Sequence, residues 1–278
     1  MSALPDNSAP LSQTEIRGSG AQARMVLGTL TAELKTADQT DHQMMAVVPQ
    51  LSLFADGERI ARMTGSPATA ETVNAQAQFL ELDPTNHLPE LALTSFSGGA
   101  HCCTEIKVAT SVSDGSWRVV DLGIWNGSEA RFVDANSNGS LELVQRDNDF
   151  LYAFDCYACS AAPLQILAVR DGKASDVSRD PSFHLYHRTY LNEMERQTGM
   201  RGDTFSPGFW AGWVAQKALL GEGKEAFGRM LSAYNPMRDE GYMSCADGRP
   251  DCPVREEVFQ SYPVALKRFL DYRNYSTE

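Results

Sequence analysis

Cysteine side chains carry the first chemistry that the spacing of this sequence suggests. The sequence has six cysteines in three local pairs, spaced C-C, C-x2-C and C-x6-C, and a histidine precedes the first pair. These residues are His101, Cys102, Cys103, Cys156, Cys159, Cys245 and Cys252. A thiolate attacks electrophiles or binds soft metals, and two thiols can oxidise to a disulfide. The even number and local pairing favour disulfides, which are typical of exported proteins.

Three interpretations of the first two pairs stay open. In one, Cys102 or Cys103 is a nucleophile and His101 is its general base. In another, His101 and the four cysteines hold zinc or copper. In the third, which we favour, the four cysteines form structural disulfides. Links between the pairs are favoured over links within them, because a strand-to-strand bond is the commoner geometry, but the sequence alone leaves the pairing unknown.

The C-terminal pair lies in the stretch "CADGRPDC" at residues 245–252. Turn residues between the two cysteines can bring their α-carbons within the roughly 4.4–6.8 Å that a disulfide needs. We therefore predict a bond between Cys245 and Cys252. We also predict that it fixes the start of a last helix that Pro253 opens.

Oxygen-bearing side chains alternate in "DANSNGSLE" at residues 134–142. The side chains are those of Asp134, Asn136, Asn138, Ser140 and Glu142, and a glycine stands at the sixth position. Calcium takes six to eight oxygen ligands, and a glycine permits the tight turn that brings them together. The spacing predicts a weak calcium site, because two of the five side chains are charged. It is not an EF-hand, since Gln145 stands at the twelfth position, where that loop has glutamate.

A weaker copy of this pattern precedes it in "LDPTNHLPELALTSF" at residues 82–96. It keeps Asp83 and Glu90 but lacks the glycine, and the sequence leaves open whether it binds an ion. The two copies, within residues 80–170, resemble the calcium loops of FG-GAP/VCBS repeats, as in integrin-type propellers and in exported bacterial proteins without an assigned activity. The resemblance implies the same five ligands in residues 134–142. The β-rich segment has room for about three blades, too few to close a propeller.

The elements that must position these side chains are of two kinds. Short apolar runs separated by turn residues predict antiparallel strands. These runs are 25–36, 50–63, 90–96, 106–112, 117–125, 141–145, 150–154 and 164–177. Helical spacing and capping residues then predict helices. These segments are 183–197, 206–221, 224–236 and 253–273.

The order of these elements predicts an α+β protein. A flexible N-terminal tail covers residues 1–24, and a β-rich domain covers residues 25–180 as an open sheet, a sandwich or a partial propeller. A helical domain covers residues 181–278. The boundary follows the change from strand-like to helical spacing near Pro181.

Composition excludes some classes of function. The formal net charge of −12 argues against nucleic acid as a partner, which would need a basic face. No run reaches the roughly 18 apolar residues of a membrane span. We expect a periplasmic or extracellular protein whose signal peptide is absent from this sequence.

Two classes of function follow. We favour a calcium-binding, disulfide-stabilised binding or structural module over an enzyme, with a protein or a glycan as its partner. The alternative is a hydrolase or a thiol- or metal-dependent enzyme centred on His101 and the cysteine pairs. A free and fast-reacting thiol would favour the alternative.

Overall fold

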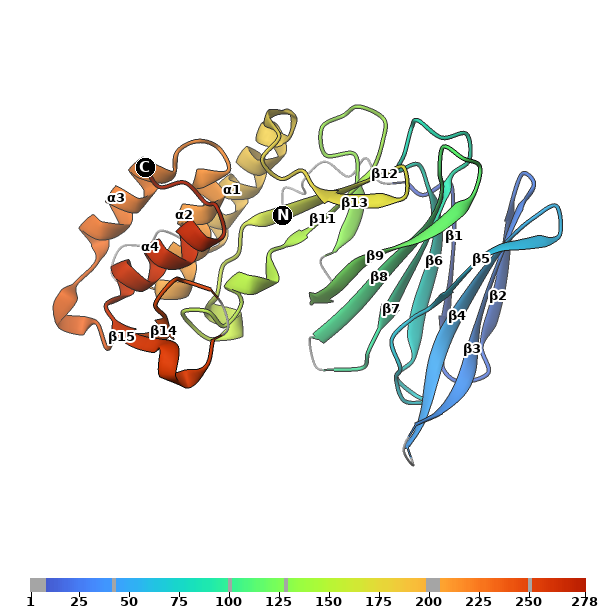
Figure 1. Ribbon diagram of the computed structural model, residues 1–278, viewed down its shortest axis with the longest axis horizontal. Helices are drawn as coiled ribbons and strands as arrows, with labels where there is room; N and C mark the ends of the chain where they lie inside the picture. The colour runs from blue at the N-terminus through green and yellow to red at the C-terminus, as the bar shows by residue number, and fades with distance from the viewer. Residues whose placement is uncertain (1–8, 42–43, 100–101, 128–129, 199–205, 250–251) are drawn as a thin grey trace. The chain divides into compact units, whose positions relative to one another are not determined.

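The chain forms two compact units in a computed structural model that describes it from residue 9 to residue 278, except residues 42–43, 100–101, 128–129, 199–205 and 250–251 (Figure 1). The β-rich unit comprises Asp6–Gln145 and Ile166–Val177, and the helical unit comprises Arg146–Gln165 and Ser178–Glu278. The predicted fold class is confirmed: antiparallel strands make up the N-terminal half, and four α-helices lie in the C-terminal half.

Two segments differ from the predicted organisation. Strand β1 (Ser12–Arg17) pairs with β6 (Asn74–Leu80), although its residues were assigned to a flexible tail. Ile16 is the one buried side chain of β1, so the strand carries little apolar signal. Residues 146–165 belong to the helical unit, although they precede the predicted boundary.

A five-stranded antiparallel sheet has both of its faces buried in the β-rich unit. Its order is β1-β6-β7-β8-β9. The last three strands are β7 (Glu90–Phe96), β8 (Cys102–Ser111) and β9 (Trp117–Asn126). Successive side chains of a strand point to opposite faces. Accordingly Leu91 and Leu93 of β7 enter one apolar cluster, and Ala92 enters another.

A second sheet covers one of these faces. It has the order β2-β3-β4-β5. Its strands are β2 (Gln22–Leu27), β3 (Leu30–Asp41), β4 (Met44–Ala55) and β5 (Glu58–Thr64). Leu34 and Leu51 of this sheet are buried in the same cluster as Phe79 of β6. The dipeptide Asp56-Gly57 joins β4 to β5 with φ values of 49° and 86°, as expected of a two-residue hairpin turn.

A third sheet covers the other face and carries the candidate calcium loop. It has the order β10-β11-β12-β13. Its strands are β10 (Arg131–Val133), β11 (Glu142–Arg146), β12 (Leu164–Arg170) and β13 (Lys173–Asp176). Leu143 and Val169 of this sheet share an apolar cluster with Ile106 and Val108 of β8. The stretch between β10 and β11 is thus held at both ends by buried strands.

The described part of the helical unit contains four α-helices. They are α1 (His184–Thr198), α2 (Pro207–Ala218), α3 (Gly223–Ala233) and α4 (Tyr262–Tyr272). Helix α2 starts where the sequence predicts it, because the Ser206 hydroxyl accepts a hydrogen bond from the Phe209 N–H at 3.4 Å. Trp213 of this helix is buried in the core of the unit.

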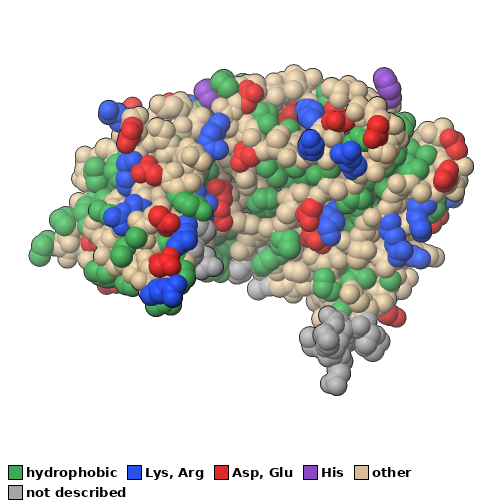
Figure 2. All heavy atoms as spheres, viewed as in Figure 1, with side chains coloured by type: hydrophobic (Ala, Val, Ile, Leu, Met, Phe, Trp, Pro, Cys, Tyr) green, Lys and Arg blue, Asp and Glu red, His purple; other side chains and the backbone are tan. Residues whose placement is uncertain are grey.

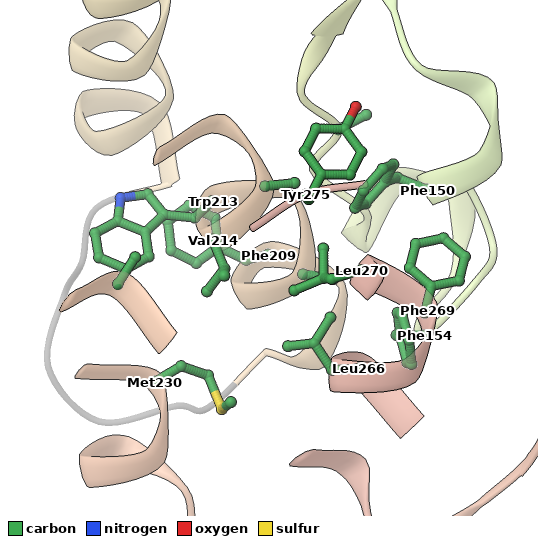
Figure 3. Packing of buried hydrophobic residues seen from close by; sticks show 14 of the residues in the cluster. Phe150, Phe154, Phe209, Trp213, Val214, Met230, Leu266, Phe269, Leu270 and Tyr275 are labelled. Carbon is green, nitrogen blue, oxygen red and sulfur yellow. The ribbon is translucent and has the colours of Figure 1, made fainter. Parts of the chain in front are cut away.

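Aromatic side chains from residues 146–165 complete that core (Figure 3). The rings of Phe150 and Phe154 meet the ring of Phe269 edge-to-face, with centroids 5.0 and 5.2 Å apart. The sequence predicted a strand at 150–154, but Asn148–Phe150 forms a 3-10 turn that the Asp147 side chain caps. Capping by aspartate competes with strand formation, which explains the difference.

The last helix begins later than the sequence predicts. Residues 257–260 form strand β15 (Glu257–Gln260), which pairs with β14 (Tyr242–Cys245), and α4 starts at Tyr262. Pro263 lies in the first turn of α4, where its missing N–H costs nothing. A helix from Pro253 would instead place this proline in its interior, where it would remove a backbone hydrogen bond.

The structure joins Cys245 to Cys252, whose α-carbons are 6.0 Å apart. This bond closes the segment after β14 and does not lie at the start of α4. Replacing both cysteines with serine is expected to lower the free energy of unfolding by about 2–3 kcal/mol, because the unfolded chain loses a short loop constraint. Chemical denaturation measures the loss. Peptide mapping without reductant should find the two cysteines linked to each other, and finding either one free would refute the pairing.

Charged side chains of both signs are interspersed over the face of the molecule that Figure 2 shows. Among the described residues, no helix is long and apolar enough to span a membrane.

Candidate calcium loop and cysteine pairs

The loop between β10 and β11 closes around the carboxylate of Asp134. One oxygen of this carboxylate accepts a hydrogen bond from the Asn138 N–H at 2.9 Å, and the other accepts one from the Gly139 N–H, also at 2.9 Å. Gly139 has a φ of +91°, which favours glycine at this position. The first and sixth positions of the predicted site therefore fold onto each other. Each carboxylate oxygen keeps a further lone pair for a cation.

The side-chain oxygens of Asn136 and Asn138 accept hydrogen bonds from backbone N–H groups of the same loop. The Asn136 side-chain oxygen accepts from the Asn138 N–H at 3.1 Å. The Asn138 side-chain oxygen accepts from the N–H and the hydroxyl of Ser140, at 2.9 and 2.8 Å. Backbone hydrogens thus point at the side-chain oxygens and fix the curvature of the loop. The structure brings Asp134, Asn136, Asn138 and Ser140 together in one turn.

Glu142 is the first residue of β11, directly after the loop, and is 1% exposed. Its carboxylate accepts a hydrogen bond from the Ala135 N–H at 3.2 Å. Burial raises the pKa of Glu142 to about 7, and the nearby charge of Asp134 adds to this rise. The Ala135 N–H and the Arg170 guanidinium oppose the rise. A cation in the loop would favour the ionised form of Glu142.

Arg170, at the end of β12, supplies a positive charge beside the loop. One of its terminal nitrogens donates to the Ser140 hydroxyl at 3.0 Å and lies 4.0 Å from the Glu142 carboxylate. The other donates to the backbone carbonyl of Leu82. The guanidinium partly balances Glu142, so Glu142 contributes less charge to a calcium site than the sequence suggests.

In the weaker copy of the pattern, the carboxylates of Asp83 and Glu90 both accept hydrogen bonds from nearby backbone and side-chain groups. The Glu90 carboxylate accepts from the N–H groups of Leu82 and Asp83, as Glu142 does from Ala135. Asp83 is 1% exposed, and its two carboxylate oxygens accept from Thr85 and from the Asp171 N–H. The first copy uses its oxygens to hold its own turn and the β12–β13 hairpin.

The cysteines are all bonded within their local pairs. The favoured links between pairs are thus absent, since Cys102 is joined to Cys103 and Cys156 to Cys159. Cys102 and Cys103 lie in the β-rich unit, and Cys156 and Cys159 lie in the helical unit. His101 lies outside the described residues.

This pairing bears on the two alternative interpretations. Cys102 and Cys103 offer no free thiol to a nucleophilic mechanism while they are bonded to each other. Of the described residues, Asp155, Cys156 and Cys159 place a carboxylate oxygen and two sulfur atoms within 4.8 Å of one another, but these sulfur atoms are bonded to each other and are not free thiolate ligands. Asp155 was not among the predicted site residues, although it directly precedes the C-x2-C motif.

Comparison with known proteins gives a family but no activity. Residues 187–274 match the family described as the sll0997 C-terminal domain. The "Probable thylakoid lumen protein sll0997" of Synechocystis sp. is 36% identical over 248 residues, which are 87% of this chain and 72% of that protein. The chain belongs to the sll0997 family.

A second relative extends this family. The "Uncharacterized protein y4bJ" of Sinorhizobium fredii is 29% identical over 237 residues, or 82% of this chain. The chain spans 37% of the length of y4bJ. No solved structure matches the chain.

Membership of the sll0997 family corrects the resemblance drawn from the two loops. The FG-GAP/VCBS assignment is wrong, because the chain matches the sll0997 C-terminal domain and is 36% identical to a member of that family over 87% of its length. Alternating oxygens around a glycine are a local solution to a tight turn, and unrelated folds share them. The predicted location outside the cytosol agrees with the lumenal location that the name of the Synechocystis relative states for that protein.

Proposed function

We propose that the protein is an exported, disulfide-stabilised binding or structural module whose β-rich unit binds a calcium ion in the loop 134–142. The observation that carries the proposal is the closure of this loop by the Gly139 N–H on the Asp134 carboxylate. It places the oxygens of Asp134, Asn136 and Asn138 in one turn, as a calcium ion requires. Ser140 and Glu142 complete the proposed set.

The charges near the loop support weak binding. Asp134 and Glu142 are the acidic members of the set, and Arg170 lies 4.0 Å from the latter. Sites with few charges in extracellular modules have dissociation constants of about 10⁻⁴–10⁻³ M. Such a site is occupied where calcium is abundant, outside the cytosol, and the ion then rigidifies the loop.

Two observations support export. The six cysteines are all oxidised in pairs, which is rare in reducing compartments. The name of a relative with 36% identity states that the relative is a probable protein of the thylakoid lumen. The partner class, a protein or a glycan, stays a prediction.

Calcium is expected to raise the melting temperature of the full chain over that measured with chelator. Stabilisation by mass action is about 2.7 kcal/mol when calcium is about 100 times its dissociation constant. Asp134→Ala should abolish this response, because it removes the carboxylate around which the loop closes. Differential scanning calorimetry at neutral pH measures both.

The matched control is Asp114→Ala. Asp114 is an exposed aspartate that accepts from the Ser116 N–H in the β8–β9 turn, so this variant also loses a turn aspartate. It should keep the full calcium response. An unchanged melting temperature with and without chelator in the wild type would refute the proposed site.

A further inference from the structure

The bond between Cys156 and Cys159 is exposed, unlike the other two disulfides. Both of its cysteines are exposed on the surface of the helical unit. Cys245 is 4% exposed, and Cys102 and Cys103 are half-buried. An attacking thiolate must reach a sulfur atom, so exposure selects which disulfide reacts.

Buried groups of the helical unit hold the backbone around this bond in place. The buried Ser160 hydroxyl donates to the Cys156 carbonyl at 2.9 Å and accepts from the Tyr152 N–H at 3.3 Å. Gly208, in the first turn of α2, lies so close that an added Cβ would stand 2.9 Å from the Cys159 carbonyl oxygen. Hydrogen bonds and close packing therefore hold the backbone of the pair in addition to the disulfide.

An exposed aromatic side chain stands beside the pair. Tyr152 is 56% exposed, and its ring lies 5.5 Å from that of Tyr157, the residue that follows Cys156. Tyr152 has a φ of +65°, a conformation that is unfavourable for a bulky side chain. Backbone strain of this kind clusters at functional sites. Exposed tyrosines offer apolar contact area to an approaching protein.

A carboxylate completes the arrangement. An oxygen of Asp155 and the sulfur atoms of Cys156 and Cys159 all lie within 4.8 Å of one another. The Asp155 side chain accepts from the Cys156 N–H at 2.8 Å, which fixes its position. A negative charge this close disfavours the thiolate form of the reduced cysteines. Asp155 is thus placed to control how fast the reduced pair reacts.

We propose that Cys156 and Cys159 form a redox-active pair that exchanges with the dithiol of another exported protein. A thiolate of that dithiol attacks one sulfur atom, the bond between Cys156 and Cys159 breaks, and a mixed disulfide forms. The released sulfur takes up a proton from water. The second thiol of the partner loses its proton and attacks the mixed disulfide, and the other cysteine is released and protonated. Two electrons and two protons pass from the partner to this chain, and the partner is oxidised.

The test follows the three disulfides of the native full chain in dithiothreitol, used as the dithiol probe, at neutral pH. Samples are acid-quenched, alkylated and mapped by mass spectrometry. The Cys156–Cys159 bond should be reduced at least tenfold faster than either other bond, and a glutathione redox buffer should reoxidise it reversibly. Reduction of another pair at the same rate, or survival of this bond until the protein unfolds, would overturn the proposal.

Two variants separate a redox role from a structural one. Asp155→Asn should speed alkylation of the reduced pair at pH 7 by about twofold to fivefold and move its pH profile downward, because the thiolate is no longer opposed by a carboxylate. An unchanged profile would remove Asp155 from the mechanism. A variant with serine at both 245 and 252 is the matched control, and its exchange at Cys156–Cys159 should be unchanged.

Discussion

Replacing His187 with alanine is expected to lower the free energy of unfolding of the helical unit by about 3–5 kcal/mol. His187 on α1 is fully buried, and its Nε2 lies 2.8 Å from the Ser178 carbonyl oxygen. The buried Gln216 amide on α2 donates to its Nδ1 at 3.0 Å. The proton of the neutral ring is therefore on Nε2, which donates to Ser178.

The expected loss of unfolding free energy is large because the buried hydrogen-bond network includes more groups than the His187 ring. The Gln216 side-chain oxygen accepts from the Leu164 N–H at 2.9 Å, so the same amide links α1, α2 and the start of β12. Truncation of His187 leaves a cavity and removes the hydrogen bonds that its ring makes with the Ser178 carbonyl and the Gln216 amide. Urea denaturation followed by circular dichroism measures the change.

His184→Ala is the matched control for this prediction. His184 lies one turn earlier on the same helix and is exposed. Its loss should change the free energy of unfolding by less than about 0.5 kcal/mol, as is usual for surface positions. Equal effects of the two variants would show that the buried network does not stabilise the unit.

Glu142 is expected to make the β-rich unit less stable as the pH rises from 5 to 8. Its pKa is raised from 4.5 to about 7 in the folded protein, so the folded state binds more protons than the unfolded state between these values. The stability that it contributes is complete below pH 4.5 and is lost as the pH rises through about 7. The shift corresponds to about 3 kcal/mol.

Glu142→Gln should remove this part of the pH dependence. The amide is a neutral isostere of the protonated acid, so the variant should gain stability over the wild type at pH 8 and little at pH 5, without calcium. Chemical denaturation across this range gives the difference between the two proteins. The difference isolates Glu142 from Glu90 and Asp147, whose pKa values burial also raises. A constant difference at every pH would contradict the assignment.

Local signals in the sequence were sufficient for much of the fold. Ser206 and Pro207 identify the start of α2, and Asp56-Gly57 identifies a hairpin, because caps and tight turns depend on neighbouring residues alone. Strand β15 was missed, because its pairing with β14 depends on residues distant in the sequence. The periodicity of 253–273 is that of a helix only from Tyr262 onward.

The candidate loop was predictable only in part, because some of its contacts are local in the sequence and others are not. The alternation of oxygens and the glycine at 139 are local, and the structure brings those oxygens into one turn. The approach of Arg170 to Glu142 depends on how β12 enters the third sheet, and no spacing rule reveals it. The FG-GAP/VCBS assignment failed because a turn shared by many folds does not identify one.

Calorimetric titration of calcium at pH 7 in buffers of different ionisation enthalpy tests the central claim, a calcium site beside a buried carboxylate, most directly. We expect saturable binding in the wild type with release of up to about half a proton per ion, because Glu142 is half-protonated at this pH. We expect binding without proton release in Glu142→Gln, and no binding in Asp134→Ala. No saturable heat from the wild type up to about 10 mM calcium, well above the dissociation constants of extracellular calcium modules, would contradict it.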